Sequence, residues 1–196
     1  NYGFSAAPEI EAVRAAAQAA KRAKIAVLLL PGIGTVPDLV QAREAGATVV
    51  RVATHVTEAD ISHEHISEAK KMGFFVVGFL MMAHRGSAAR VLEEAKKMES
   101  YGADVVYSTD SAGALLPDGV RERIGILREH LSVPIGFHSH NNLGLAIGNS
   151  LAAIDAGATY IDGSLGGLGA GAGNTATEML VAVLERAGVN KKADLF

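Results

Sequence analysis

Cysteine is absent from this 196-residue chain, and so is tryptophan. Without cysteine the chain forms no disulfide and offers no thiolate to a metal, which is compatible with the reducing cytoplasm where we expect it. Long apolar runs are also lacking. The longest, residues 25–31 and 74–83, have the length of a strand and are far too short to span a membrane. We therefore expect no membrane partner.

Clusters of lysine and arginine are lacking too, and the formal net charge is −3. This charge pattern argues against nucleic acid or an anionic membrane surface as the main partner and favours a small neutral or anionic substrate. What the chain does have is apolar residues, at 49% of the total. A chain of this length and composition can bury one substantial core, so we expect residues 1–196 to form one domain.

Six apolar, β-branched runs of strand length alternate with segments of helical periodicity. The predicted strands are residues 25–30, 48–54, 74–81, 104–108, 135–140 and 159–165, and the predicted helices are 37–45, 58–72, 87–101, 118–131, 143–156 and 175–187. A further helix precedes them and opens at Pro8-Glu9-Ile10, with proline in its first turn. The pattern is a βα unit repeated six times.

Glycine follows most of the predicted helices, at the position where a left-handed residue commonly ends a helix. These glycines are Gly46, Gly73, Gly102, Gly157 and Gly188. After residue 131 the chain uses Ser132-Val133-Pro134 instead, and proline also prevents a helix from continuing. These helix-ending residues support the βα repeat.

Two architectures fit such a repeat, an open doubly wound sheet and a (β/α)8 TIM barrel. We favour the barrel, because polar residues follow many of the strands rather than one switch point. They are Thr54-His55, Asp110-Ser111, residues 138–140 and residues 162–164. Six units are two short of a closed ring. We expect the first two strands to lie upstream of Asn1, so that both chain ends are cuts within a longer protein; a mature processed terminus is the alternative.

Two histidines, His138 and His140, end the predicted strand 135–140 and lead into an asparagine-rich turn. Residues two apart in a strand point to the same side, so both imidazoles face one spot. The apolar Ile135 and Phe137 suit the helix-facing side, which directs the histidines to the barrel mouth. Imidazole is the commonest ligand of divalent transition metals, and an acidic third ligand would complete an open site. The pair predicts a metal-dependent enzyme.

His63 and His65 have the same spacing but lie in a predicted helix that starts like a capping box at residues 57–60. Residues two apart on a helix diverge. We therefore expect this pair to lie on a solvated helix face rather than at a metal.

Polar loops follow two of the strands. In residues 107–113, Asp110 and Ser111 could hold a substrate carbonyl or carboxylate, and capping of a turn is the alternative. The stretch 163–174 is rich in glycine. Gly171, Gly173 and Ala176 satisfy a variant dinucleotide fingerprint with alanine last, but no strand supplies the expected acidic residue about 20 positions later. We interpret it as a tight loop around the substrate, with Asn174 capping the last helix.

Other polar residues receive weaker assignments. Arg51 lies within a strand, where a cation needs a partner, and a structural ion pair inside the barrel is the expected role. His55 and His84 end neighbouring strands and could line the cavity. The chain has no Ser-His-Asp order, no Walker loop and no lysine at a strand end, which disfavours Schiff-base aldolase chemistry.

Many segments together give the chain a specific resemblance to the 4-hydroxy-2-oxovalerate (4-hydroxy-2-oxopentanoate) aldolases, pyruvate-specific enzymes of the HMG-CoA lyase-like TIM-barrel superfamily. They are residues 1–4, 28–34, 51–60, 77–82, 98–103, Asp110-Ser111, 138–143 and 167–174. The resemblance implies that His138 and His140 bind a divalent cation, usually manganese, with magnesium or cobalt as alternatives. It implies that Ser111 and His138 hold the pyruvyl part of the substrate.

The reaction implied is retro-aldol cleavage of 4-hydroxy-2-oxopentanoate to pyruvate and acetaldehyde, with the cation offsetting the charge of the pyruvate enolate. The implied partner is an acylating acetaldehyde dehydrogenase, and a homo-oligomer is possible. In this family the first strand carries an Arg-Asp pair, and the catalytic histidine follows shortly after it. This chain lacks these residues, and it also lacks the family's C-terminal helical region with a tyrosine. We therefore expect the isolated chain to bind metal weakly and to be inactive.

Three alternatives stay open. An HMG-CoA lyase-like or acyl-CoA condensing enzyme could use the same barrel, although related enzymes carry a Glu-Arg pair where this chain has Gly171-Ala172. A non-haem iron oxygenase would use a similar pair of histidines with a carboxylate. A noncatalytic barrel fragment could serve in binding or assembly.

Overall fold

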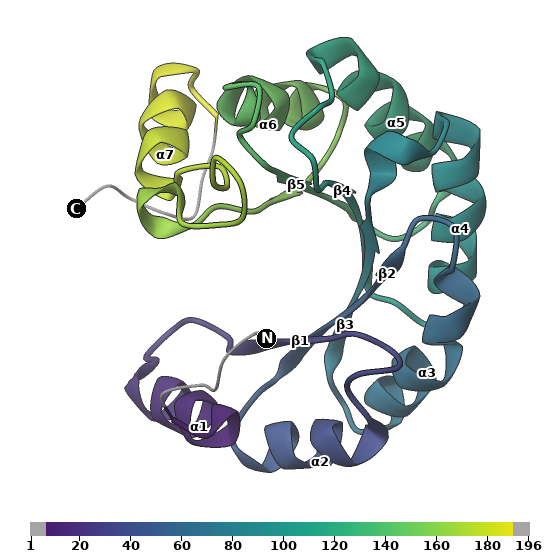
Figure 1. The fold of residues 1–196 in the computed structure, drawn as a ribbon, viewed down its shortest axis with the longest axis vertical. Helices are drawn as coiled ribbons and strands as arrows, with labels where there is room; N and C mark the ends of the chain where they lie inside the picture. The colour runs from purple at the N-terminus through teal and green to yellow at the C-terminus, as the bar shows by residue number, and fades with distance from the viewer. Residues whose placement is uncertain (1–6, 190–196) are drawn as a thin grey trace.

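The structure is a computed structural model that describes residues 7–189. Six parallel strands form one sheet in the order β1-β2-β3-β4-β5-β6 (Figure 1). The strands are β1 (Ala26–Leu29), β2 (Val49–His55), β3 (Phe75–Met81), β4 (Val105–Asp110), β5 (Ile135–Ser139) and β6 (Tyr160–Ile161). Each strand pairs in parallel with the next one in sequence, and the parallel direction requires the crossover connections that the helices supply.

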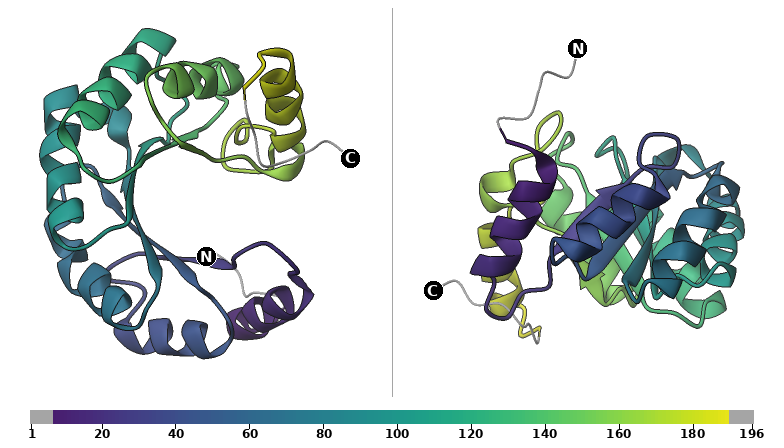
Figure 2. Two further views of the ribbon diagram at one scale, coloured as in Figure 1. Left: turned by 180° about the vertical axis from the view of Figure 1, so that it is seen from behind. Right: turned by 90° about the horizontal axis from the view of Figure 1, so that it is seen from below.

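Helices connect the strands and lie on the convex side of the sheet (Figures 1 and 2). They are α1 (Glu9–Ala19), α2 (Val36–Glu44), α3 (His63–Lys71), α4 (Ala88–Ser100), α5 (Pro117–His130), α6 (Ala146–Asp155) and α7 (Thr177–Arg186). Short 3-10 turns, η1 (Ala59–Ser62), η2 (Ala83–Arg85) and η3 (Leu165–Gly167), lie in the loops. None of the helices described within residues 7–189 has the length and apolar character needed to span a membrane.

All six predicted strands and all seven predicted helices are present. Most of their ends lie within three residues of the prediction, and two elements differ by more. The segment 58–72 divides into η1 and α3, and the last strand shrinks from residues 159–165 to Tyr160–Ile161. Strand β6 pairs only with β5. The N–H of Asp162 still donates to the carbonyl of Phe137, but beyond Gly163 the chain leaves β5, and Ser164 pairs with Ala176 instead.

The local signals act as expected at the helix ends. All five glycines predicted to follow helices have positive φ angles, between 66° and 106°. At the start of α2, the backbone N–H and the hydroxyl of Thr35 both donate to Asp38, at 2.8 and 2.7 Å. The Asp38 carboxylate thus satisfies the backbone N–H of the residue that precedes the helix.

The core has two layers, one on each face of the sheet. Between sheet and helices lies the larger cluster, which includes Ile135 and Phe137, each 1% exposed. On the concave face a smaller cluster contains Val77, Phe79 and Tyr107. Parallel sheets are normally covered on both faces, which explains why the strand sequences are almost continuously apolar.

The sheet curves into an incomplete ring whose two ends do not meet (Figure 1). Within residues 7–189, the outer edges of β1 and β6 have no strand partner. Consecutive strand order with helices on one side is the arrangement of a TIM barrel and not of a doubly wound sheet, which has helices on both faces. The fold is a (β/α)8 barrel of which six units are present.

Candidate active site at the barrel mouth

His138 and His140 come together at the carboxyl end of β5. Their ring centroids lie 5.1 Å apart, and both residues are half-buried. His138 is on the concave face, since its ring is 5.6 Å from that of Phe79, whereas Ile135 and Phe137 face the helices. This is the alternation expected from the sequence.

Each of the two imidazoles uses its Nδ1 atom in a contact within the protein. His138 Nδ1 lies 2.8 Å from the Asp162 carboxylate, and His140 Nδ1 lies 3.3 Å from the carbonyl of Ala170. Both partners can only accept hydrogen bonds, so both Nδ1 atoms donate, and in the neutral form of each ring the lone pair is on Nε2. Neutral imidazoles with a free Nε2 are suited to a divalent cation.

A third ligand is not supplied by the described part of the chain. Among residues 7–189, no group of three or more histidine, cysteine, aspartate or glutamate side chains could hold a metal ion. The two imidazoles are therefore two of the three protein ligands of the predicted site, and cation binding at them stays a prediction.

Asp162, directly after β6, connects His138 to Arg51 of β2. Its carboxylate accepts from both side chains. Burial raises the pKa of Asp162, but the hydrogen bond from His138 and the positive charge of Arg51 outweigh burial and hold that pKa below its ordinary value. The predicted ion pair of Arg51 is confirmed, and its partner is a residue at the mouth.

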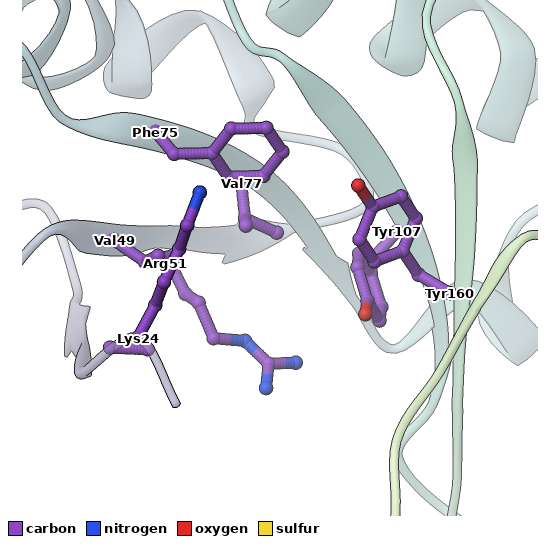
Figure 3. Close-up of a pocket in the computed structure, with 8 residues that line it drawn as sticks. Lys24, Val49, Arg51, Phe75, Val77, Tyr107 and Tyr160 are labelled. Carbon is purple, nitrogen blue, oxygen red and sulfur yellow. The ribbon is translucent and has the colours of Figure 1, made fainter. Parts of the chain in front are cut away.

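Elsewhere the concave face carries apolar and aromatic side chains beside Arg51 and Lys24. A cavity of about 370 Å³ there is lined by side chains from most of the strands: Lys24, Ala26, Val49, Arg51, Phe75, Val77, Tyr107 and Tyr160 (Figure 3). Burial, together with the negative charge of Asp162, raises the pKa of the Tyr107 hydroxyl, so Tyr107 stays neutral. The cavity therefore lies on the concave face of the sheet, the face that lines the interior of a barrel.

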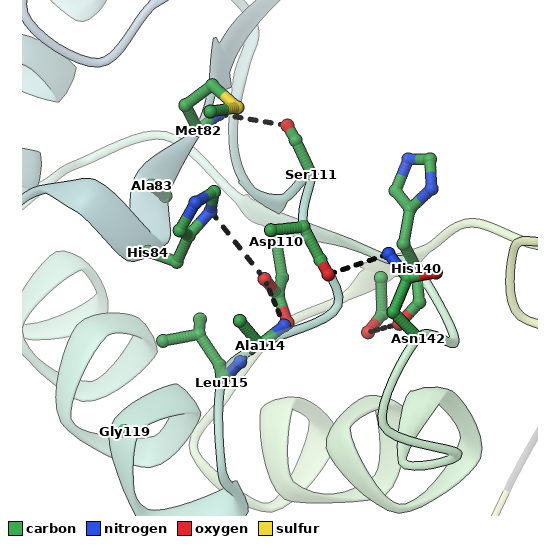
Figure 4. A network of polar contacts seen from close by, with 12 residues as sticks. Met82, Ala83, His84, Asp110, Ser111, Ala114, Leu115, Gly119, His140 and Asn142 are labelled. Carbon is green, nitrogen blue, oxygen red and sulfur yellow. Dashed lines mark hydrogen bonds and ion pairs between the residues drawn. The ribbon is translucent and has the colours of Figure 1, made fainter. Parts of the chain in front are cut away.

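Ser111, in the turn after β4, lies at the mouth beside the end of β3. Its hydroxyl oxygen accepts a hydrogen bond of 2.9 Å from the backbone N–H of Met82 (Figure 4). Met82 is the one non-glycine residue of the described chain with a positive φ angle, 59°. With its oxygen already accepting, the hydroxyl retains its hydrogen to donate to a ligand.

For Asp110 the sequence left two alternatives, holding the substrate and capping a turn, and in the structure Asp110 caps the turn after β4. Its side chain is completely buried and accepts from the backbone N–H groups of Ala114 and Leu115, both at 3.0 Å. His84 Nδ1 lies 3.8 Å from the same carboxylate (Figure 4). Burial lowers the pKa of His84, and the charge of Asp110 only partly opposes this shift.

Asn142 ties three loops of the mouth together. Its amide donates to the carbonyl of Ala112, and its oxygen accepts from the N–H of Ala172 in the glycine-rich loop. Gly113 packs so closely that a Cβ atom there would lie 2.6 Å from the backbone nitrogen of Asn142. The β4 turn, the β5 turn and the glycine-rich loop therefore form one connected rim.

The prediction that Asn174 caps the last helix is wrong. Helix α7 begins after Ala176, and the Asn174 amide donates to the carbonyl of Leu168, within the loop. The loop uses this side chain to hold its own shape, because Asn174 lies two residues too early to reach the first turn of α7.

The other histidines take separate roles. His55 Nδ1 lies 2.8 Å from the Thr57 hydroxyl. His63 is exposed and packs against Tyr101, whereas His65 is half-buried with Nε2 3.2 Å from the carbonyl of Gly34. The pair on α3 does not converge, as expected, although His65 is less solvated than predicted.

Sequence reasoning listed Asp162 among the polar residues at strand ends but gave it no role. Its partners are 111 and 24 residues away in the chain. The only available signal was the conjunction of a cation within one strand with an acid at the end of another.

Comparisons with known proteins agree with this geometry. The model of the HMGL-like family matches residues 1–196. The chain is 60% identical over 195 residues to the 4-hydroxy-2-oxovalerate aldolases of Pelotomaculum thermopropionicum and Geobacillus stearothermophilus, covering 100% of this chain but 58% and 57% of theirs. The chain thus spans somewhat more than half the length of these relatives.

Among solved structures, the N-terminal domain of a Bacteroides vulgatus protein assigned to the aldolases is similar, with a TM-score of 0.80 and 29% identity over 92% of this chain and 62% of that one. The carboxyl transferase domain of Rhizobium etli pyruvate carboxylase has the same fold, with a TM-score of 0.80 at 20% identity, over 89% of this chain and 32% of that one. With a family match along its whole length, the chain belongs to the HMGL-like family.

Proposed function

We propose that this chain is the larger part of the catalytic barrel of a metal-dependent aldolase, a carbon–carbon lyase that cleaves 4-hydroxy-2-oxopentanoate to pyruvate and acetaldehyde. The name of the relatives at 60% identity supports the reaction. The observation that carries the proposal is the pair of imidazoles at the mouth, 5.1 Å apart with Nε2 free on both rings.

His138 and His140 would hold the divalent cation, with manganese as the first candidate and magnesium or cobalt as alternatives. When bound, such a cation supplies positive charge that stabilises the negative charge left on the pyruvyl part as the carbon–carbon bond breaks. The chain's own contribution is to present two imidazoles in fixed orientation, each with its Nδ1 atom in contact with an acceptor.

Ser111 and His138 would contact the pyruvyl part of the substrate. The Ser111 oxygen already accepts from Met82, so its hydrogen can be donated to the substrate carboxylate or carbonyl. The rim held by Asn142 would close around the substrate and limit access of water. By the family resemblance, the acidic third ligand, an arginine and the histidine that removes the 4-hydroxyl proton come from a strand before residue 1.

A hybrid enzyme tests the proposal. This chain replaces the matching 195 residues of the Pelotomaculum thermopropionicum aldolase, which restores a complete barrel. We expect manganese-dependent pyruvate release, measured with lactate dehydrogenase and NADH. His140→Ala should reduce kcat/KM by more than about 100-fold, because several kcal/mol of charge stabilisation is lost.

The matched control is His130→Ala, which removes an exposed histidine at the end of α5. A hybrid without activity, or equal losses in both variants, would reject the assignment. The 196-residue chain alone should release pyruvate at a small fraction of the hybrid's rate, since its two imidazoles lack the partners named above. Comparable turnover by the chain alone would contradict that part of the proposal.

The second product is a volatile, reactive aldehyde, and we propose an acylating acetaldehyde dehydrogenase as the partner that consumes it. Co-elution of such an enzyme with the hybrid on size exclusion, compared with the dehydrogenase alone, tests this association. Separate elution at micromolar concentrations of both proteins would argue against a stable complex.

A further inference from the structure

Arg51 is a charged residue in the middle of β2, on the concave face of the sheet. Its guanidinium carbon lies 4.3 Å from the ring centroid of Phe79 and 5.1 Å from that of Tyr107. Stacking on two aromatic faces holds the planar group in one orientation. The fixed guanidinium donates to the carboxylate of Asp162 across the barrel interior.

The oxygen of Asp162 that accepts from Arg51 is the same oxygen, Oδ2, that lies 2.8 Å from His138 Nδ1. All three side chains are largely buried, with 25%, 17% and 18% of their surface exposed for Arg51, Asp162 and His138. A carboxylate cannot donate, so His138 must carry its hydrogen on Nδ1. The lone pair of this ring is thereby directed to Nε2.

We propose that Asp162 is a positioning residue for the cation-binding face of His138, and that Arg51 holds Asp162 in place. This inference rests on the proposed function, in which His138 Nε2 is a metal ligand. Carboxylates that accept from the second nitrogen of a ligating histidine fix the tautomer and the ring orientation, and their loss typically costs 10–100-fold in metal affinity.

The two histidines differ in how firmly they are held. His140 faces a backbone carbonyl at 3.3 Å, whereas His138 faces a carboxylate at 2.8 Å that is anchored by a cation. Charge-assisted hydrogen bonds are shorter and stronger than neutral ones. His138 is therefore the pre-oriented ligand of the pair, and changes at Asp162 act on it first.

The first measurement needs no metal. In the full chain labelled with ¹⁵N-histidine, long-range ¹H–¹⁵N spectra report which nitrogen of each neutral imidazole carries hydrogen, and His138→Gln identifies the His138 signals. We expect the Nδ1–H tautomer at His138 in the unaltered protein. The Nε2–H tautomer there would overturn the proposal, whatever the behaviour of the variants.

The second measurement is manganese affinity, from the loss of the free-ion electron paramagnetic resonance signal on titration of the same full chain and of the hybrid. Asp162→Asn should weaken binding by about 10–100-fold and reduce the Nδ1–H population. Arg51→Gln should have a smaller effect in the same direction, because the carboxylate remains but loses its anchor. The double variant Arg51→Met/Asp162→Asn avoids a buried unpaired cation and should match Asp162→Asn.

The matched control is Asp104→Asn, which removes the carboxylate of another inter-element ion pair, to Lys70 at 2.6 Å, away from the mouth. It should leave both the tautomer and the manganese affinity unchanged. The positioning role would be overturned if Asp162→Asn bound manganese within twofold of the unaltered protein, or if Asp104→Asn lost as much manganese affinity as Asp162→Asn. Suppose that Asp162→Asn changes the His138 tautomer but no form of the protein binds manganese. That result would reject the cation site and would leave established that Asp162 orients His138.

Discussion

Gly136 shows at the residue scale how closely the concave face is packed. A Cβ atom at this position of β5 would lie 2.2–2.5 Å from three ring carbons of Tyr107 on the neighbouring strand. Glycine inside a strand often marks such a close approach. The absence of a side chain here lets Tyr107 lie flat beside β5, between Phe79 and Tyr160.

Gly136→Ala should therefore lower the free energy of unfolding by about 1–3 kcal/mol, the usual cost of forcing extra atoms into a packed core. Gly125→Ala is the control: it lies in α5 with nothing within 4 Å of the added atom, and should stabilise the protein by about 0.5–1 kcal/mol. Urea denaturation followed by circular dichroism measures both. Equal effects of the two changes would contradict the packing argument.

His84 predicts a pH dependence of stability. Burial lowers the pKa of the folded His84 below the value of about 6.5 that it has in the unfolded chain. On acidification the unfolded chain binds a proton at this residue before the folded protein does, so stability falls as the pH drops below about 6.5. Above that pH the residue is neutral in both states and contributes no slope.

We expect His84→Gln to show a smaller loss of urea midpoint between about pH 7.5 and pH 5.5 than the unaltered protein, because this proton uptake is removed. His130→Gln, at the exposed end of α5, serves as the control and should keep the original pH slope. A slope unchanged by His84→Gln would show that burial does not shift the His84 pKa as described.

At the scale of elements, α4 is tied to the turn before α3 by a buried acid. Glu94 is 0% exposed; Oε2 accepts from the N–H of Ala59 at 2.9 Å, and Oε1 contacts Arg90 and Lys97 at 2.7 and 2.8 Å. The carboxylate thus accepts a hydrogen bond from the backbone N–H of Ala59, the first residue of η1, which has no partner within its own turn. The contact fixes how α4 sits on the loop that follows β2.

Glu94→Ala should destabilise the protein by about 2–3 kcal/mol, since a buried N–H loses a charged acceptor. Glu93→Ala removes a neighbouring, exposed carboxylate that pairs only with Arg90, and should change stability by about 0.5 kcal/mol or less. Denaturant unfolding of the two variants gives the comparison. A difference below about 0.5 kcal/mol would rule out the bridging role of Glu94.

The elements were largely predictable, and the contacts between distant ones were not. Local signals fixed the strands and helices: the apolar runs, the glycines after helices, and the proline at the start of α1. The adjacency of His138 and His140 follows from the two-residue period of a strand. The bond from Arg51 to Asp162 depends on barrel curvature, and the early end of β6 depends on its lack of a second neighbour.

At the scale of the whole molecule, the open ring leaves two strand edges and an apolar concave face uncovered within residues 7–189. Leu28 in β1 is 56% exposed and Tyr160 in β6 is 40% exposed. Unpaired edges and exposed apolar surface favour association with other chains.

We therefore expect the 196-residue chain to self-associate at micromolar concentrations, as measured by sedimentation velocity, and to enhance the fluorescence of an apolar dye. The hybrid, with a closed barrel, should bind the dye more weakly and should not form open-ended aggregates. A chain that stays monomeric and dye-free at all concentrations would contradict this expectation.

Consecutive strand order also bears on how the molecule assembles during synthesis. Each strand needs only the preceding βα unit as its template, so units can dock one after another as the polypeptide emerges, and short sequence separations favour rapid folding. The Arg51–Asp162 bond, which joins residues 111 positions apart, cannot form until the sixth unit has been made. The imidazole of His138 therefore gains its fixed orientation only after the segment through Asp162 has been made.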